Sequence, residues 1–216
     1  MHIKRKTIGK FWPVPRTGTK YMTVPSHEQN SSLPLIAVMR DVLKLVKTNK
    51  ELKKLLNEKK VQVNGKVVNE LKYPLALFDT LGFPSVKKFY RVSLKNKFEL
   101  VPIKEAEANS KIYEVINKRI LPNKKVQLNL NQGRNILSNE KLEVGDYVVV
   151  DLAKNKITKV VSLKKDVPVL VIAGKHSGVE GKIKDIVVSG DQKVAIIKTS
   201  EGEVKSNLKN IFAVEE

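Results

Sequence analysis

The sequence predicts a multidomain α+β protein with a helix pair and a β-hairpin near its start, a small central β domain and a small β-barrel at its end. Apolar residues recur at helical spacing between residues 35 and 46, whereas the second half alternates apolar and polar residues in short runs bounded by turn residues. The length of 216 residues exceeds a typical single domain, which favours several modules. The expected modules are a basic N-terminal arm at 1–30, a helix–hairpin module at 31–100, a central β-rich domain at 101–165 and the barrel at 166–216.

The charge of the chain indicates a polyanionic partner. It holds 41 Lys and Arg against 22 Asp and Glu, for a net charge of +19 and a pI near 9.9. A field of this size attracts nucleic acid. An acidic membrane is a weaker candidate, because no lysine-rich helix has a broad apolar face and no apolar run reaches the ~18 residues of a membrane span. The basic start lacks the apolar segment of a signal peptide, so we expect an intracellular, cytoplasmic protein with no membrane partner.

The first 27 residues contain no acid and carry several prolines and glycines. Such a segment is expected to lack regular structure and to be unable to fold alone. Its aromatic residues, Phe11, Trp12 and Tyr21, can stack on bases or fill a groove, and leaving them in water is costly. This favours a nucleic-acid-binding arm over a flexible tail without a role. Its predicted RNA-binding residues are Lys4, Arg5, Lys6, Lys10, Arg16 and Lys20.

Two helices are expected next. Ser32 can cap the first, with Pro34 in its first turn and the apolar face continuing through Lys47. Thr48 or Asn49 can cap the second. Its leucines, Leu52, Leu55 and Leu56, are expected to point inward, with the neighbouring lysines outward.

The stretch "VQVNGKVV" at 61–68 predicts a β-hairpin with Asn64-Gly65 as its two-residue turn. Because almost no acid is interspersed among the lysines of this module, they favour a phosphate-binding face over an ordinary solvated surface. The predicted RNA-binding residues here are Arg40, Lys44, Lys47, Lys53, Lys54, Lys59, Lys60, Asn64 and Lys66.

The second half of the chain is predicted to form short β-strands. A short helix is expected after Pro102, then strands with turns at Gln132-Gly133, Gly145-Asp146 and near Asn155, which is typical of a small barrel or sandwich. The charge of this part is nearly neutral, so we expect it to act as a spacer or to dock onto other components. From residue 167 onward, about fifty residues of strands and tight turns fit a five-stranded barrel.

The loop "GKHSGVEGKIK" at 174–184 is not a nucleotide cradle. A Walker loop requires Ser or Thr after Gly181-Lys182, where Ile183 stands, and its first glycine position is occupied by His176. Gly174, Gly178 and Gly181 instead fit a tight turn with positive φ and close backbone approach. A barrel turn explains the glycines as well as RNA contact does. The predicted RNA-binding residues are Lys175, His176 and Lys182.

No catalytic or metal constellation is recognisable. The chain has no Cys, which removes thiolate zinc sites and cysteine nucleophiles, and its three His are far apart in sequence. A Gly-x-Ser-x-Gly nucleophile motif is also absent. Asp79 follows an apolar run, and a capping or salt-bridge role within the module is favoured over that of a general base. We therefore expect no enzymatic activity, no cofactor, no metal and no small-molecule substrate.

The helix pair followed by "KKVQVNGKVV" resembles the S4 RNA-binding domain, in which the helix pair and hairpin loop contact RNA. The loop "GKHSGVEGKI" resembles the KOW motif, which implies an SH3-like barrel. Together with "HIKR", "LPLIAVMRDVLK", "YPLALFD" and "LEVGDYVVVDL", in this order, the chain resembles the archaeal and eukaryotic ribosomal protein family S4e. The resemblance implies a structural protein of the small ribosomal subunit that contacts ribosomal RNA and neighbouring ribosomal proteins. The compact length and Lys-rich composition indicate the archaeal version.

Two alternatives stay open. An RNA-modifying enzyme with an S4 targeting module would need a catalytic domain, for which the remaining hundred residues are too small and too strand-repetitive. A KOW-type transcription elongation factor would leave the first hundred residues without a role.

Overall fold

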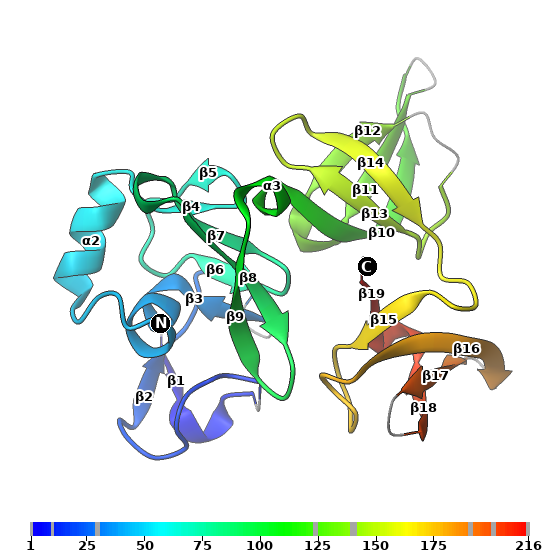
Figure 1. Cartoon of the computed structure of the whole chain (residues 1–216), viewed down its shortest axis with the longest axis horizontal. Helices are drawn as coiled ribbons and strands as arrows, with labels where there is room; N and C mark the ends of the chain where they lie inside the picture. Colours follow the sequence, from blue (N-terminus) through cyan, green and yellow to red (C-terminus); the bar gives the residue numbers. More distant parts are fainter. Residues whose placement is uncertain are drawn as a thin grey trace. The chain divides into compact units, whose positions relative to one another are not determined.

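Most of the regular secondary structure is β-strand, with few helices, as a computed structural model shows (Figure 1). The structure describes residues 2–9, 11–28, 31–122, 125–138, 142–189, 192–199 and 202–214. The chain divides into two compact units, residues 1–109 and 110–216. Each unit contains its own sheets and its own buried core.

The N-terminal segment has regular structure, contrary to expectation. Strand β1 (His2–Lys4) pairs with β2 (Tyr21–Thr23), and a short 3-10 turn, η1 (Arg5–Thr7), follows β1. Trp12 is only 5% exposed. The ring of Phe11 packs edge-on against Phe98 with 5.0 Å between the ring centroids. The segment folds because it shares the core of the first unit, and the burial of these rings offsets the entropy lost on ordering. Trp12 is therefore not available to stack on bases.

The first helical segment consists of α1 (Leu35–Ala37) and a wider π-helical continuation, η2 (Val38–Val42). It ends before the expected Lys47, because Lys44 adopts the left-handed conformation with φ of 53°. The backbone N–H of Leu45 then donates to the carbonyl oxygen of Met39 at 2.9 Å, as in a Schellman-type helix end.

Ser32 does not cap this helix, so that expectation is wrong. Ser32 lies in strand β3 (Ser32–Pro34), which pairs with β6 (Pro74–Ala76), and its hydroxyl donates to the carbonyl oxygen of Glu28 at 2.6 Å. Pro34 takes the cap position, and no side chain bonds to the helix start. Strand pairing with Ala76 holds Ser32 in extended conformation, away from the helix N-terminus.

The second helix, α2 (Asn49–Asn57), agrees with the sequence. The Thr48 hydroxyl accepts a hydrogen bond from the Glu51 N–H at 3.3 Å, which identifies Thr48 as the cap. Leu52 and Leu56 are fully buried, and Leu55 is half-buried. The apolar face therefore points into the core of the first unit.

The main sheet of the first unit has the strand order β5-β4-β7-β8-β9. The hairpin at its edge turns through Asn64 and Gly65, both with positive φ (51° and 74°), as a type I′ turn requires and as the sequence predicts. A short helix, α3 (Glu105–Ala108), ends the unit where one was expected. The strands are β4 (Gln62–Val63), β5 (Lys66–Val67), β7 (Thr80–Phe83), β8 (Lys88–Leu94) and β9 (Phe98–Ile103), with a 3-10 turn η3 (Pro84–Val86) between β7 and β8.

The first sheet of the second unit has the order β12-β11-β10-β13-β14. The expected turns at Gln132-Gly133, Gly145-Asp146 and Asn155 are present, and Gln132 and Asn155 both have positive φ. The inward face forms one apolar cluster around Val115, Leu128 and Val150. The elements are β10 (Ser110–Ile120), β11 (Val126–Leu130), η5 (Asn131–Gly133), β12 (Asn135–Ser138), β13 (Tyr147–Asp151) and β14 (Lys156–Val161).

The last sheet has the order β18-β17-β16-β15-β19 around a separate apolar cluster. In the glycine-rich loop, Gly174 and Gly178 have positive φ, and a Cβ at Gly181 would lie 2.5 Å from the carbonyl oxygen of Lys198. The predicted tight turn with close backbone approach is confirmed. The elements are β15 (Pro168–Val171), β16 (Glu180–Ser189), β17 (Gln192–Thr199), β18 (Gly202–Asn207), η6 (Leu208–Asn210) and β19 (Ile211–Ala213).

Candidate nucleic-acid interface

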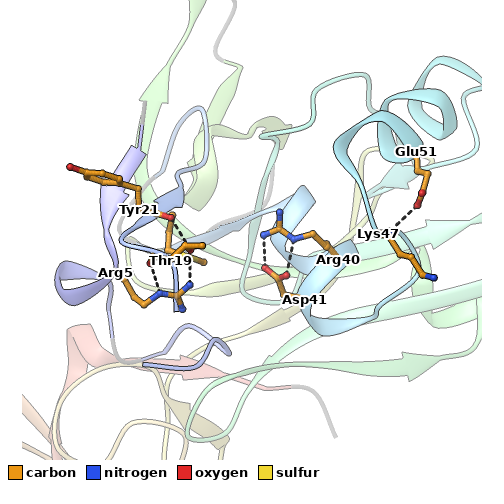
Figure 2. A network of polar contacts seen from close by, with 8 residues as sticks. Arg5, Thr19, Tyr21, Arg40, Asp41, Lys47 and Glu51 are labelled. Carbon is orange, nitrogen blue, oxygen red and sulfur yellow. Dashed lines mark hydrogen bonds and ion pairs between the residues drawn. The ribbon is translucent and has the colours of Figure 1, made fainter. Parts of the chain in front are cut away.

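A groove in the first unit brings together residues that the sequence analysis assigned to two separate modules. One wall comes from the N-terminal segment and the other from the end of the first helix and the loop after it. The groove has a volume of about 900 Å³. Its charged lining consists of four cations and one acid, namely Arg5, Arg40, Lys44, Lys47 and Asp41. Figure 2 shows Arg5, Arg40, Asp41 and Lys47. The excess of positive charge suits a polyanion.

Arg5 braces the wall of the groove. Its guanidinium donates to the carbonyl oxygen of Thr19 at 2.7 Å and to the Thr19 hydroxyl at 2.9 Å (Figure 2). It also donates to the carbonyl oxygen of Pro15 at 2.6 Å. These bonds tie the loop after η1 back to the start of the chain. Three of the five guanidinium N–H groups are thereby used within the protein.

Arg40 and Asp41 form a bidentate ion pair on the opposite wall. The Nε and one terminal nitrogen of Arg40 donate to the two carboxylate oxygens of Asp41, at 2.8 and 2.9 Å. The hydrogen bond to Asp41 raises the pKa of the Arg40 guanidinium above its ordinary value. Both side chains remain partly exposed, at 38% and 29%. The pair is locally neutral, so the net charge of the groove comes from the other cations.

Among the other cations of the groove, Lys44 and Lys47 have exposed side chains. The Glu51 carboxylate accepts the backbone N–H of Lys47 at 2.7 Å, and the charge of the Lys47 ammonium acts on it in addition. This backbone hydrogen bond is the main reason why the pKa of Glu51 is lowered. Within the described ranges, neither ammonium group makes an ion pair with a carboxylate.

Further exposed lysines lie on and after α2. Lys53, Lys54 and Lys59 are exposed, and Lys60 pairs with Glu58 at 2.7 Å. The ion pair with Lys60 lowers the pKa of the Glu58 carboxyl. Because this pair is exposed, it contributes little to stability, and Lys60 can exchange its partner for a phosphate.

The hairpin turn is held by a buried carboxylate. Asp79 is 4% exposed and accepts hydrogen bonds from the Asn64 amide and from the Ala76 N–H, both at 2.7 Å. The Asn64 amide oxygen in turn accepts the N–H of Thr80 at 3.0 Å. Both ends of the Asn64 amide are thus engaged within the protein, and Lys66 lies exposed on the strand that follows. The bonds that Asp79 accepts here, from the Asn64 amide and the Ala76 N–H, differ from the helix cap or salt bridge that the sequence favoured.

The other predicted residues are spread over both units. In the first unit, Lys4, Lys6 and Arg16 are exposed, and the Lys20 ammonium lies 5.4 Å from the centre of the Tyr21 ring. Lys10 lies outside the described residues. In the second unit, Lys175 and Lys182 are exposed and His176 is half-buried.

Sequence reasoning missed the uncharged lining of the groove. Threonines and apolar side chains of the N-terminal segment carry no periodic or charge signal, so only the fold identifies them. Lys111, which is 3% exposed, was also missed, and its ammonium lies 4.9 Å from the centre of the Tyr113 ring. The missed uncharged residues that line the groove are Val14, Pro15, Thr17, Thr19, Met22, Thr23 and Val46, whereas Tyr21, also in the lining, was named as a residue that could fill a groove.

The described part of the chain contains no group of three or more His, Asp or Glu side chains arranged to hold a metal ion. Among the same residues, no helix is long and apolar enough to cross a membrane.

Known proteins resemble the chain over nearly its whole length. A model of ribosomal family S4e matches residues 86–157, and a model of the S4 domain matches residues 35–81. The small ribosomal subunit protein eS4 of Methanocella arvoryzae is 34% identical over 220 residues, which cover 99% of this chain and 93% of that protein. The protein of the same name from Nanoarchaeum equitans is 34% identical over 223 residues, covering 100% and 95%.

A solved structure shows the same similarity. The crystal structure of the 30S ribosomal protein S4e from Thermoplasma acidophilum matches with a TM-score of 0.70 at 26% sequence identity. The match covers 86% of this chain and 96% of that chain.

Proposed function

Because the chain belongs to ribosomal family S4e, we propose that it is a structural constituent of the small ribosomal subunit and that it acts there by binding ribosomal RNA. Its location is the ribosome in the cytoplasm, since its relatives are named as small-subunit ribosomal proteins. Those relatives are archaeal, which agrees with the compact, Lys-rich sequence. Its partners are the RNA of the small subunit and neighbouring ribosomal proteins.

The single observation that carries this function is the groove in the first unit. Cations from the N-terminal segment and from the helical region converge there, and the matched S4 domain spans the helical wall. Among the described residues, neither Lys44 nor Lys47 makes a direct ion pair with a carboxylate, so a phosphate can bind their ammonium groups without breaking one. Each such contact releases counterions from the RNA, which makes affinity depend steeply on salt.

The residues proposed to contact RNA share a basic or polar side chain. Arg5 and Asn64 contribute by shaping the groove wall and the hairpin, because their polar groups are largely used within the protein. Lys10 is included on sequence grounds alone. The proposed contacts are Lys4, Lys6, Lys10, Arg16, Lys20, Arg40, Lys44, Lys47, Lys53, Lys54, Lys59, Lys60, Lys66, Lys175, His176 and Lys182.

The four sequence modules remain the proposed organisation, with a basic arm at 1–30, an S4-type helix pair and hairpin at 31–100, a central β domain at 101–165 and a KOW-containing SH3-like barrel at 166–216. The strand order β18-β17-β16-β15-β19 and the turn through Gly174 and Gly178 support the last assignment. The proposed role is structural and not enzymatic, because the relatives are named as proteins of the small ribosomal subunit.

Filter binding to small-subunit ribosomal RNA fragments across a salt series tests this function. Charge reversal of Lys44, Lys53 and Lys60 to Glu should weaken binding to all fragments and reduce the log–log salt slope by about 2–3. The matched control reverses Lys154, Lys156 and Lys209, which are exposed lysines of the second unit, and so changes the net charge equally. Equal losses in the two triple variants would contradict the proposed surface.

Sedimentation of cell lysate separates this function from its rivals. A structural ribosomal protein should sediment with small subunits at moderate salt. Co-sedimentation of the protein with RNA polymerase would instead support an elongation factor. Recovery of the protein in the soluble fraction together with an RNA-modifying activity would support an enzyme.

A further inference from the structure

The lining of the groove is partly apolar and so can contact more than a phosphate group. Alongside its cations it is lined by Val14, Pro15, Met22 and Val46, of which Met22 and Val46 are buried at 7% and 4% exposure. Its volume of about 900 Å³ falls within the ~300–1,000 Å³ of pockets that enclose small ligands. The phosphates of a duplex need only an open cationic surface, whereas an apolar interior gains free energy only from an apolar or aromatic group such as a base.

The position of Asp41 also favours a base over a phosphate next to Arg40. A phosphate that approached the Arg40 guanidinium would also approach the Asp41 carboxylate, which grips that guanidinium through two hydrogen bonds. Like charges repel, so Arg40 is the least favourable cation of the groove for a phosphate. An uncharged base suffers no such repulsion.

The same ion pair holds the Arg40 guanidinium in a fixed orientation, which favours stacking of a ring on it. A guanidinium is planar, and the two-point contact with Asp41 fixes the orientation of its plane. Because the pair is already formed, little conformational entropy is left to lose when a ring stacks on it. Unpaired RNA bases stack on arginine planes as well as on aromatic rings.

We propose that the groove binds one unpaired nucleotide of the RNA. Its base stacks on the Arg40 plane and contacts the apolar lining, while Lys44 and Lys47 bind the phosphates next to it. This inference rests on the proposed RNA-binding function and adds the kind of RNA recognised, a bulged or looped nucleotide rather than a continuous duplex. It also gives Arg40 a role different from that of the neighbouring lysines.

Two variants of the full-length protein separate these roles. Arg40→Lys keeps the positive charge but removes the plane. Lys44→Gly removes a charge but suits the left-handed backbone at this position, where φ is 53°, so the fold is retained. The probes are an RNA stem with a single-nucleotide bulge carrying 2-aminopurine and the same stem fully paired. The fluorescence of Trp12, the single tryptophan, verifies folding of the first unit for each variant.

Arg40→Lys should weaken binding of the bulged stem about 5- to 150-fold, the range that corresponds to the loss of one stacked base. The affinity for the paired stem should fall by a much smaller factor, and the salt slope should stay the same because the charge is kept. The change in 2-aminopurine fluorescence that the wild-type protein causes should disappear in the variant. Lys44→Gly should instead reduce the salt slope by about 0.7–0.9 on both stems.

If Arg40→Lys binds the bulged stem as tightly as the wild type while Arg40→Ala binds it more weakly, the positive charge alone is sufficient. That result would overturn the stacking role of Arg40 and leave the RNA-binding function standing. Equal affinity of the wild-type protein for both stems would also overturn the inference. If the protein binds neither stem nor any ribosomal RNA fragment, the proposed function itself fails.

Discussion

Asp79 provides the most direct test of how the hairpin of the first unit is held. The change is Asp79→Ala, which removes the buried acceptor of two hydrogen bonds, from the Asn64 amide and the Ala76 N–H, each 2.7 Å long. A buried donor that loses its acceptor costs about 1–3 kcal/mol, so the two donors together should cost about 2–6 kcal/mol. This is a large part of the ~5–15 kcal/mol by which a domain is stable.

The assay is urea unfolding followed by the fluorescence of Trp12. It is the only tryptophan of the chain, is 5% exposed and belongs to the first unit, so its signal reports that unit. With an m-value of about 2 kcal/mol/M, the midpoint should fall by about 1–3 M. The urea midpoint of Asp79→Asn should fall by less, because this variant keeps the side-chain volume and one acceptor oxygen.

A double-mutant cycle with Asn64→Ala shows whether the contact itself is responsible. The double variant should be more stable than the sum of the single losses predicts, by at least ~0.5 kcal/mol, because the Asn64–Asp79 bond is lost only once. Additivity within ~0.3 kcal/mol would refute the reasoning, and so would a midpoint of Asp79→Ala equal to that of the wild type.

Two further predictions concern the second unit. The Tyr147 hydroxyl donates to the carbonyl oxygen of Ile211 at 2.8 Å, so Tyr147→Phe should cost about 1 kcal/mol at pH 7 by circular dichroism. Burial, reinforced by the charge of Glu114, raises the pKa of Tyr147, so the folded state holds this proton more tightly and loses stability as the pH rises above ~10. The variant should lack that part of the alkaline loss; the same pH profile in both proteins would contradict the assignment. Gly181→Ala should destabilise the unit by about 1–3 kcal/mol, because the new Cβ would lie 2.5 Å from the Lys198 carbonyl oxygen, and an unchanged melting temperature would show that the strands can separate there.

Local features were predictable from neighbouring residues. The Asn64-Gly65 turn follows from the ease with which both residues adopt positive φ, and the Thr48 cap follows from a hydroxyl that reaches the N–H three residues later. Ser32 shows where this reasoning fails. It is an equally good cap by type, yet strand pairing with Ala76 commits its backbone elsewhere. Lys44 carries no sign of its left-handed conformation, which the end of the helix imposes.

The sequence by itself determined the net charge of +19, the cationic bias of the first half and the hairpin, because each depends on composition or on residues a few positions apart. Only the tertiary structure decided that Arg5 braces one wall of a groove whose other wall holds Arg40 and Lys44. That arrangement depends on the burial of Trp12 and Met22 within the first unit. Such burial is a property of packing between distant segments, and no pattern along the chain encodes it locally.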